Sequence, residues 1–361
     1  MKIYYDYQIF SLQKFGGISR YYCELIKHLN EQNNVFAKTK CFNSRNDYYK
    51  KWIGNIFIDN KYISKVANVL NRAYTFFVSN KYDIIHPTYY SPYIFKLKKK
   101  IVITVYDMIH EKFSDISSAD PKVIINKKEA IYKSDHIIAI SENTKKDILS
   151  IYPDIPSDKI SVIYIGSDFV KREIIDSSIK NIFPKKYILY TGNRNYYKNF
   201  AFFFNSIKNL LIEDKELYLV CVGGNEFDEV EKEMFSDVSK KVVYIKPSDD
   251  IFIYAYSNAL CFVFPTQYEG FGIPTLEAFA CDCPAIISNV SSMPEVGGDA
   301  VLYIDPYDKD DIYQKVKTLI YDDSLRNELI KKGRLQLTKF SWEIISKQIV
   351  NCYSSIKKKG S

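Results

Sequence analysis

Short apolar runs alternate with longer segments of helical spacing along the first half of the chain. The runs that predict strands are Lys2–Tyr5, Tyr82–Ile85, Ile101–Val105, His136–Ile140 and Ile160–Ile165. Between the first two runs, apolar residues return every three or four positions from about Ser19 to Asn30, which is the spacing of an amphipathic helix. Strands that alternate with helices predict an α/β fold with a parallel, doubly wound sheet.

The second half of the chain repeats this alternation. Its predicted strands are Tyr187–Tyr190, Leu217–Val222, Val242–Ile245, Leu260–Phe264, Ala285–Ile287 and Ala300–Ile304. The polar segment 171–186 between the two sets predicts a linker, and the spacing from Trp342 to about Ile356 predicts a final helix. Because 361 residues exceed one ordinary core, we expect two domains of roughly 170 residues each. Their expected bounds are 1–170 and 187–340, followed by a C-terminal helix and tail at 341–361.

The segment YEGFGIPTLEA at 268–278 carries the most specific chemistry. It contains two carboxylates, Glu269 and Glu277, and a Gly-Phe-Gly turn and Pro274 lie between them. Proline suits the first turn of a helix, so a helix is predicted to begin here after the buried strand at 260–264. The free amides of that first turn form an anion site. Two acids around an anion site predict a nucleotide-sugar pocket.

Composition and charge narrow the class of protein. Hydrophobic residues make up 47% and charged residues 26%, as in a soluble globular protein. The chain has no apolar run as long as a membrane span and no signal-peptide pattern at its start, so we expect a cytoplasmic protein. The seven cysteines form no CxxC pair, which favours free core thiols over disulfides or a metal site.

Two charged clusters each allow two interpretations. Lys96, Lys98, Lys99 and Lys100 fit attraction to an anionic membrane surface or a solvated loop, and the loop is the simpler interpretation. The DxD pattern of residues 308–310 fits a metal site or a helix cap with solvated charge. Because a polar run surrounds this pattern and a helix follows it, we expect the cap, and we expect neither a metal nor another cofactor.

Seven segments, in chain order, resemble the retaining glycosyltransferases of family 4, which have the GT-B fold. They are FGGISRY (15–21), TVYDMIHEKF (104–113), IIAISENTKKDI (137–148), ISVIYIGSD (160–168), ILYTGNRNYYKNF (188–200), YEGFGIPTLEA (268–278) and SSMPEVGGDAVLYIDP (291–306). The resemblance implies two Rossmann-like domains facing a central cleft, with the C-terminal helix crossing back to the N-terminal domain. It also implies that the N-terminal domain binds the acceptor and the C-terminal domain binds the nucleotide-sugar donor.

The resemblance assigns donor-site roles to particular residues. Arg194 and Lys198 match the family's phosphate-binding pair, although a solvated loop is the simpler alternative for both. Glu277 matches the acid that binds the ribose hydroxyls, and Glu269 matches the acid beside the donor sugar, where it stabilises developing positive charge. The remaining donor-binding residues that we expect are Gly16, Gly17, Phe271, Gly272 and Ile273.

The chain departs from the family pattern at one position. Many relatives carry a His-Asp pair after a strand of the first domain, whereas this chain has Tyr106 and Asp107, with His110 three residues later. A tyrosine donates a hydrogen bond but is no base at neutral pH, so Asp107 becomes the candidate for contact with the acceptor hydroxyl or the donor sugar. Further candidates for contact with the acceptor or the sugar are Tyr106, His110, His86 and Tyr89, and a structural role is the simpler interpretation of His110.

The resulting hypothesis is a retaining, metal-independent hexosyltransferase. It would use a GDP- or UDP-linked donor and a glycan or lipid-linked acceptor of surface polysaccharide such as O-antigen or capsule, with peripheral contact at the inner membrane surface. The alternative is a non-catalytic or differently specialised Rossmann-type nucleotide-binding protein. A dinucleotide-dependent oxidoreductase is disfavoured because neither half carries G-x-G-x-x-G after its first strand. Nucleic acid is not expected as a partner because the lysines are not gathered into one basic stripe.

Overall fold

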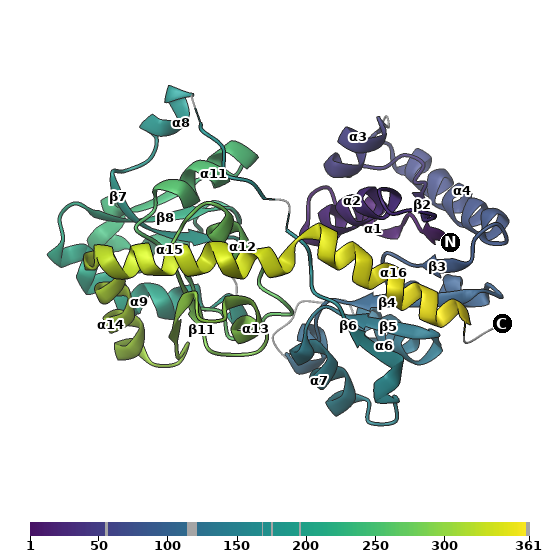
Figure 1. Cartoon of the computed structure of the whole chain (residues 1–361). Helices are drawn as coiled ribbons and strands as arrows, with labels where there is room; N and C mark the ends of the chain where they lie inside the picture. The colour runs from purple at the N-terminus through teal and green to yellow at the C-terminus, as the bar shows by residue number, and fades with distance from the viewer. Residues whose placement is uncertain (55–56, 114–120, 168, 175, 195, 359–361) are drawn as a thin grey trace. The chain divides into compact units, whose positions relative to one another are not determined.

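The computed structural model describes residues 1–54, 57–113, 121–167, 169–174, 176–194 and 196–358. The chain divides into two compact units (Figure 1). Unit 1 comprises Met1–Asp168 and Phe340–Ser361, and unit 2 comprises Phe169–Lys339. Each unit contains one six-stranded sheet whose described strand pairs are all parallel, with helices on its faces. The predicted α/β fold with two doubly wound sheets is confirmed.

Unit 1 has the strand order β2-β1-β3-β4-β5-β6. The strands are β1 (Lys2–Tyr5), β2 (Phe36–Thr39), β3 (Ile84–His86), β4 (Lys100–Val105), β5 (His136–Ala139) and β6 (Ile160–Val162). Strand β2 was not predicted because it is short and buries only alternate residues at the sheet edge. The last strand is shorter than the predicted run, although Ile163 and Ile165 beyond it remain buried.

The helices of unit 1 connect these strands. They are α1 (Gln8–Leu12), α2 (Gly17–Asn30), α3 (Asp47–Ile53), α4 (Lys61–Ser79), η1 (Pro92–Lys96), α5 (Ile109–Lys112), α6 (Pro121–Lys133), α7 (Glu142–Ile151), η2 (Ser157–Lys159) and α16 (Trp342–Lys358). The predicted cap of α7 is present, because the Thr144 amide donates to Ser141 Oγ at 3.0 Å.

Unit 2 has the strand order β12-β11-β10-β7-β8-β9. Its strands are β7 (Lys186–Thr191), β8 (Leu217–Val222), β9 (Val242–Ile245), β10 (Cys261–Phe264), β11 (Ala285–Ser288) and β12 (Val301–Ile304). Its helices are α8 (Ser177–Asn181), η3 (Tyr196–Lys198), α9 (Phe200–Glu213), α10 (Glu229–Met234), η4 (Ser236–Lys241), α11 (Asp249–Asn258), α12 (Ile273–Ala280), α13 (Met293–Gly297), α14 (Lys309–Tyr321), α15 (Asp323–Leu337) and η5 (Thr338–Phe340), which ends at the first residue of the returning part of unit 1.

The segment expected to be a linker lies within unit 2. Lys171 forms an ion pair with Asp282 at 2.9 Å, and Arg172 pairs with Asp250 at 2.5 Å. Helix α8 occupies the middle of the segment 171–186. The segment therefore has charged contacts with its own unit, although its polar composition gives no sign of these partners.

Residues predicted as caps or core thiols take those positions. Asp308 caps α14, because its Oδ1 accepts from the Asp310 and Asp311 amides at 2.9 and 3.1 Å. The DxD pattern is therefore part of a helix start. All seven cysteines are buried with free thiols, as expected. None of the described helices is long and apolar enough to cross a membrane.

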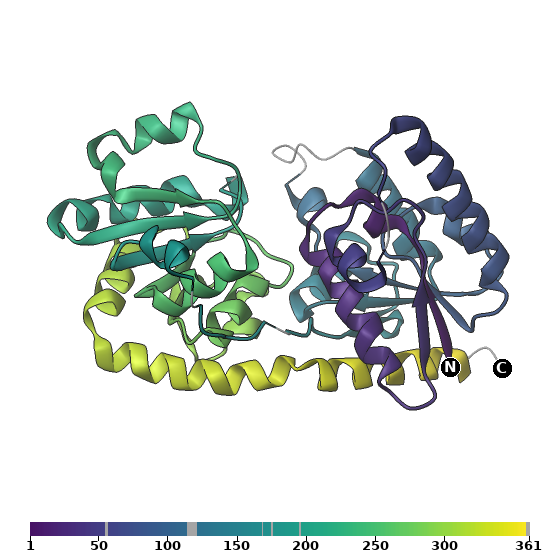
Figure 2. The same cartoon turned by 90° about the horizontal axis from the view of Figure 1, so that it is seen from above.

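The final helix α16 belongs to unit 1, as the expected return to the N-terminal domain requires (Figure 2). It packs against α2, and its Trp342 ring stacks on His28 with centroids 5.6 Å apart. A Cβ atom at Gly166 would lie 2.5 Å from the Trp342 ring, so only glycine fits there. A parallel bridge between Ser167 and Ser341 adds a backbone connection at the start of the helix.

A buried polar network joins α16 to the sheet. His86 at the end of β3 is fully buried, with Nδ1 2.6 Å from the Tyr353 hydroxyl and Nε2 3.0 Å from Thr104 Oγ1. The Tyr353 hydroxyl also lies 2.7 Å from that of Tyr5. Both ring nitrogens of His86 are thus occupied inside the core. The expectation that His86 contacts the acceptor is wrong for this reason, and the residue instead connects β3, β4 and the final helix.

This network predicts a pH-dependent stability. Burial lowers the pKa of His86 from 6.5 to about 3, so between these values the unfolded chain binds a proton that the folded chain does not. The free energy of unfolding should therefore fall as the pH drops below 6.5, by at most about 1.4 kcal/mol per pH unit. Chemical denaturation of the wild type and of His86→Gln at a series of pH values measures this contribution. The variant should be less stable near neutral pH and lose less stability on acidification, and an identical pH dependence would contradict the prediction.

Candidate functional site

The order of strands in unit 2 reverses between β7 and β10. The chain runs from β7 through β8 to β9 on one side of the sheet and from β10 through β11 to β12 on the other. In open parallel sheets, ligands bind beyond the carboxyl ends of the strands at such a reversal. Strand β7 leads into η3, which ends at Lys198, and β10 leads into the segment that contains Glu269. Two predicted site residues therefore follow the two neighbouring strands at this point.

Lys198 and Glu269 form an ion pair beyond these strands. The Lys198 ammonium donates to Glu269 Oε1, and Thr266 Oγ1 lies 3.1 Å from the same oxygen. The rings of Tyr197 and Phe264 lie 5.3 and 5.0 Å from Lys198 Nζ. Both side chains are mostly shielded from water, so their charges act at higher strength than at an open surface.

The loop that carries Glu269 is held on both sides. The Glu269 amide donates to Ser291 Oγ at 2.9 Å, and Ser292 Oγ donates to the Glu269 carbonyl at 2.9 Å. The Gln267 amide donates to the Tyr197 carbonyl at 2.6 Å, which joins the loop to η3. Sequence reasoning missed Ser291 and Ser292 as positioning residues, although they begin the SSMPEVGG motif. Their separation from Glu269 in the chain gave no sign of the contact.

Helix α12 begins where the sequence predicts it. Gly272 precedes the helix with φ at 103°, a left-handed conformation that favours glycine, and Pro274 lies in the first turn. A Cβ atom at Gly272 would also lie 2.9 Å from Met293 Sδ. Phe271 is buried and Ile273 is half-buried, and both lie next to Gly272 at the helix start. The first-turn amides provide the positive end of the helix dipole at this helix start.

Glu277 on α12 is tied to the end of β7. Its Oε2 accepts a hydrogen bond from the Tyr256 hydroxyl at 3.3 Å, and that hydroxyl lies 3.0 Å from Thr191 Oγ1. Burial, together with the nearby Glu277 charge, raises the pKa of Tyr256 well above its usual range, so this phenol remains a neutral donor. The Glu277 carboxylate is therefore oriented by Tyr256, in a residue that is half-buried as a whole.

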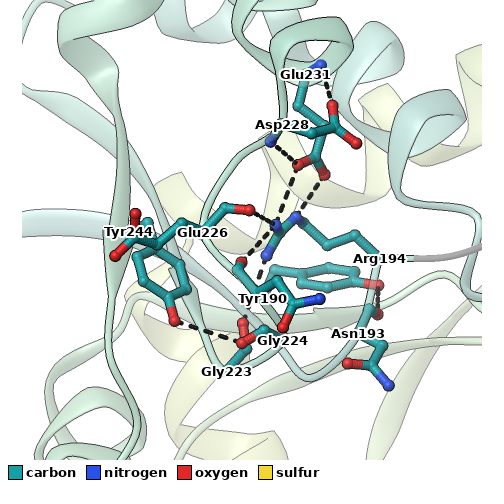
Figure 3. Close-up of polar contacts among 10 residues, drawn as sticks. Tyr190, Asn193, Arg194, Gly223, Gly224, Glu226, Asp228, Glu231 and Tyr244 are labelled. Carbon is teal, nitrogen blue, oxygen red and sulfur yellow. Dashed lines mark hydrogen bonds and ion pairs between the residues drawn. The ribbon is translucent and has the colours of Figure 1, made fainter.

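Arg194 has different partners from those that we predicted. Figure 3 shows its guanidinium directed at Glu231, with Nε 2.5 Å from Oε1 and Nη2 3.1 Å from Oε2. Nη2 also donates to the carbonyls of Asn225 at 2.7 Å and Glu226 at 3.3 Å. The ring centroid of Phe227 lies 4.8 Å from the guanidinium carbon. These contacts join the loop after β7 to α10 and to the loop that precedes it.

The charge balance at Arg194 supports a structural role. Burial disfavours the charged guanidinium, but its hydrogen bonds and ion pair with Glu231 outweigh this effect and raise the pKa of Arg194. The side chain is only 6% exposed. A donor phosphate would have to compete with the Glu231 carboxylate for the same N–H groups. Phosphate binding by Arg194 therefore stays a prediction, and the structure assigns its guanidinium to α10 instead.

In unit 1, Gly16 and Gly17 lie at the start of α2. Gly17 is its first residue and is exposed, and Gly16 precedes the helix in an extended conformation. The Gly16 carbonyl accepts from Ser19 Oγ at 2.9 Å. An added Cβ at Gly16 would collide with the side-chain amide of Gln13. The two glycines therefore leave the backbone at this helix start accessible, as their proposed approach to a donor requires.

Asp107 belongs to a charged cluster that the sequence did not reveal. Its carboxylate lies 3.8 Å from Lys127 Nζ and 4.0 Å from His110 Nδ1, and it accepts from the Ile109 amide at 3.1 Å. Lys127 is almost fully buried and also donates to Glu111 at 2.8 Å. The structure thus brings Asp107 and His110 together, and a lysine twenty residues further along the chain balances the charge.

Tyr106 and Tyr89 have contrasting surroundings. Tyr106 is 6% exposed and meets Tyr21 edge-on, with ring centroids 6.0 Å apart, so it forms part of an aromatic core. Tyr89 lines a pocket of about 270 Å³ beside the reversal of strand order between β1 and β3. The other residues that line this pocket are Tyr7, Gln8, Ser11, Leu12, Asn68, Arg72, Tyr90, Ser91 and Asn126. Of the two tyrosines, Tyr89 has the position suited to a ligand.

Both halves of the chain match known glycosyltransferase families. Residues 15–170 match the family described as Glycosyltransferase Family 4, and residues 172–336 match the family described as Glycosyl transferases group 1. The O-antigen chain mannosyltransferase B of Escherichia coli is 28% identical, over 93% of this chain and 95% of its own length.

Solved structures share the fold at low sequence identity. The sucrose-phosphate synthase from Thermosynechococcus elongatus has a TM-score of 0.74 and 18% identity, with 98% of both chains covered. Anabaena Alr3699/HepE in complex with UDP-glucose has a TM-score of 0.75 and 14% identity, over 98% of this chain and 99% of its own. Together with the family matches along nearly the whole sequence, these similarities show that the chain belongs to the family 4 glycosyltransferases of GT-B fold.

Proposed function

We propose that this glycosyltransferase moves a hexosyl group from a nucleoside-diphosphate sugar to a glycan or lipid-linked acceptor of bacterial surface polysaccharide, with retention of configuration. The observation that carries the proposal is the Lys198–Glu269 pair at the strand-order reversal, beside the start of α12. The name of the E. coli relative, an O-antigen chain mannosyltransferase, favours a mannosyl donor such as GDP-mannose. The UDP-glucose complex of the Anabaena protein keeps a UDP-linked donor as the other choice.

The side chains of unit 2 suit the donor. Lys198 has three N–H donors, so it can retain Glu269 while it binds a phosphate oxygen, and the amides of α12 add neutral donors. These groups would provide hydrogen-bond donors to the leaving nucleoside diphosphate without a metal ion. The Glu277 carboxylate would accept hydrogen bonds from the ribose hydroxyls. The orientation of this acid by Tyr256 supports that role.

The proposed reaction breaks the bond between the anomeric carbon and the diphosphate oxygen, and forms a bond from that carbon to the acceptor oxygen. The proton of the acceptor hydroxyl would pass to the departing diphosphate oxygen. Charge develops as an oxocarbenium-like state, which the Glu269 carboxylate would stabilise. Attack on the face from which the diphosphate leaves gives retention. In unit 1, Asp107 would accept a hydrogen bond from the acceptor hydroxyl or the donor sugar, with Lys127 Nζ 3.8 Å from its carboxylate.

The donor base can be identified by thermal shift. Because a ligand that binds only the folded state stabilises it by mass action, the correct nucleotide at about a hundred times its Kd adds about 2.7 kcal/mol. We expect GDP or UDP to shift the transition more than ADP or dTDP. A transfer assay with the matching sugar donor, followed by assignment of the product's anomeric configuration, then tests catalysis. A product of inverted configuration would exclude retention, and binding without any transfer would favour a non-catalytic nucleotide-binding protein.

Substitutions can separate the phosphate and ribose contacts. Lys198→Ala should weaken binding of the nucleoside diphosphate and of inorganic pyrophosphate by about 10- to 100-fold, because a charge-assisted hydrogen bond is lost. Glu277→Ala should weaken binding of the nucleoside diphosphate and leave binding of pyrophosphate unchanged. Lys208→Ala is the matched control, because Lys208 pairs with Asp237 at the surface of α9. Isothermal titration of the three variants measures both ligands, and unchanged affinity in Lys198→Ala would refute this donor site.

Arg194 should affect stability more than nucleotide binding. Removing one partner of its ion pair with Glu231 leaves a poorly solvated charge, so Arg194→Ala and Glu231→Ala should each lower the free energy of unfolding by about 1–3 kcal/mol. The free energy of unfolding of the double variant should fall by less than the sum of the two single losses. Chemical denaturation measures these losses in stability. Titration with nucleotide compares the affinity of Arg194→Ala with that of Lys198→Ala. A stable Arg194→Ala protein that loses nucleotide affinity would instead make Arg194 a phosphate ligand.

A further inference from the structure

Helix α4 of unit 1 turns its apolar side chains outward. Figures 1 and 2 show α4 at the periphery of its unit. Its large exposed side chains are Tyr62, Ile63, Val66, Val69, Leu70, Phe76 and Phe77. Tyr62 is 79% exposed, Val69 67% and Phe77 76%. At 100° per residue these positions all lie on one side of the helix, so they form a stripe along about four turns.

The inward face of α4 is attached mainly by small and polar side chains. Its buried residues are Ala67, Asn71, Thr75, Val78 and Ser79. Asn71 binds the backbone of Phe42 on both sides, accepting from its amide at 2.8 Å and donating to its carbonyl at 3.3 Å. The Tyr74 ring adds an edge-on contact with Phe42, with centroids 5.7 Å apart. The helix therefore has the reverse of the polarity that a helix packed on a globular core normally has.

Further apolar side chains are exposed just before this helix. Trp52 and Ile53 at the end of α3 are 38% and 40% exposed, and Ile58 is 51% exposed. The Ile58 backbone is held by Asn43, which accepts from its amide at 2.8 Å and donates to its carbonyl at 3.2 Å. The Asn43 amide also reaches Ser64 on α4 at 3.4 Å. These contacts hold Ile58 close to the first turn of α4.

The charges around the stripe are mostly positive. Helix α4 carries Lys61 and Lys65 and has no acidic residue, and its Arg72 lies over the Tyr93 ring at 5.6 Å, beside the pocket that Tyr89 lines. At its C-terminal end, Lys81 lies over the Phe77 ring at 5.7 Å, and Lys99 donates to the Asn80 carbonyl at 3.3 Å. Lys99 of the lysine cluster noted in the sequence therefore lies at the end of this helix, whereas Lys100 pairs with Asp135 at 3.1 Å. Asp59 before the helix is the neighbouring acid on the N-terminal side.

We propose that α4 lies in the surface of an anionic membrane, with its apolar stripe among the lipid chains and its basic residues at the headgroups. An exposed apolar stripe with basic residues on its flanks matches helices that lie in the membrane interface. Lysines and arginines close to a surface are attracted by acidic lipids. A second copy of the chain is the less suitable occupant, because a symmetric pairing would bring two positively charged helices together.

The proposal revises one interpretation made from the sequence. The simpler interpretation of Lys96, Lys98, Lys99 and Lys100 was a solvated loop, because their neighbours in space were unknown. Lys99 lies beside an exposed apolar helix and becomes part of its basic border, whereas Lys100 is paired with Asp135. Binding to lipid can be measured without donor or acceptor, so the proposal stands or fails separately from the proposed transfer reaction. If both hold, the surface would bring the enzyme to acceptors that are anchored in lipid.

Vesicle co-sedimentation tests the proposal directly. The full chain should pellet with vesicles of phosphatidylglycerol and phosphatidylethanolamine and remain in solution with phosphatidylcholine alone. The triple variant Val69→Ser, Leu70→Ser, Phe77→Ser should bind the anionic vesicles at least about tenfold less well, because its apolar contact is removed. The affinity of the double variant Lys61→Gln, Lys65→Gln for these vesicles should be several-fold lower. About 0.5 M salt should also weaken vesicle binding by the wild type.

A matched control removes apolar surface elsewhere. Val230 and Leu335 in unit 2 are 77% and 70% exposed, so Val230→Ser with Leu335→Ser should leave vesicle binding unchanged. Nucleotide binding and thermal stability of the α4 variants show that they remain folded. Equal vesicle binding by the wild type and the triple variant would overturn the proposal. So would light scattering that shows a wild-type dimer and a monomeric triple variant, because the stripe would then be an interface between two copies.

Discussion

The parallel pairing of β7 with β10 is the constraint on which the site depends. The pairing aligns Ile188 with Cys261 and Leu189 with Phe262, so both strands end at the same edge of the sheet. Crossover connections then carry the chain away on opposite sides of this pair, and no helix is required directly above it. Lys198 and Glu269, which are distant in the chain, form their ion pair at this edge. The start of α12 is the third part of the site. The position of the charges thus follows from the topology of the sheet.

Two cationic residues predicted to bind the donor lie close together in the chain but have different partners. Lys198 lies in η3, with Glu269 and two aromatic rings around its ammonium. Arg194, four residues earlier in the chain, is turned toward α10 and uses its planar set of donors on one carboxylate and several carbonyls. A guanidinium suits such a multi-sided structural contact, whereas an ammonium is a compact charge that can serve a phosphate. The roles that we assign to them follow from these geometries.

Buried side-chain hydrogen bonds attach two helices of unit 1, α16 and α4, to the rest of the unit. His86, Tyr353 and Tyr5 connect the sheet to α16 across almost the whole length of the chain. Asn71 attaches α4 to the backbone of Phe42, and the apolar side chains on the opposite side of that helix are exposed. Buried polar contacts thus replace part of the usual apolar packing. They also explain how α4 can stay attached while its apolar side chains remain exposed.

The sequence by itself determined the alternation of strands and helices, the start of α12 at Gly272 and Pro274, and the caps at Ser141 and Asp308. These features depend on periodicity, backbone conformation and hydrogen bonds between residues close in the chain, so local chemistry specifies them. It also placed Lys198, Glu269 and Glu277 in one site, but through motif resemblance. Only the tertiary structure decided that Glu231 engages Arg194, that His86 is buried, and that Lys127 lies beside Asp107. It also decided that α4 faces outward, because the partners in all these contacts are far apart in the chain and their distances depend on packing.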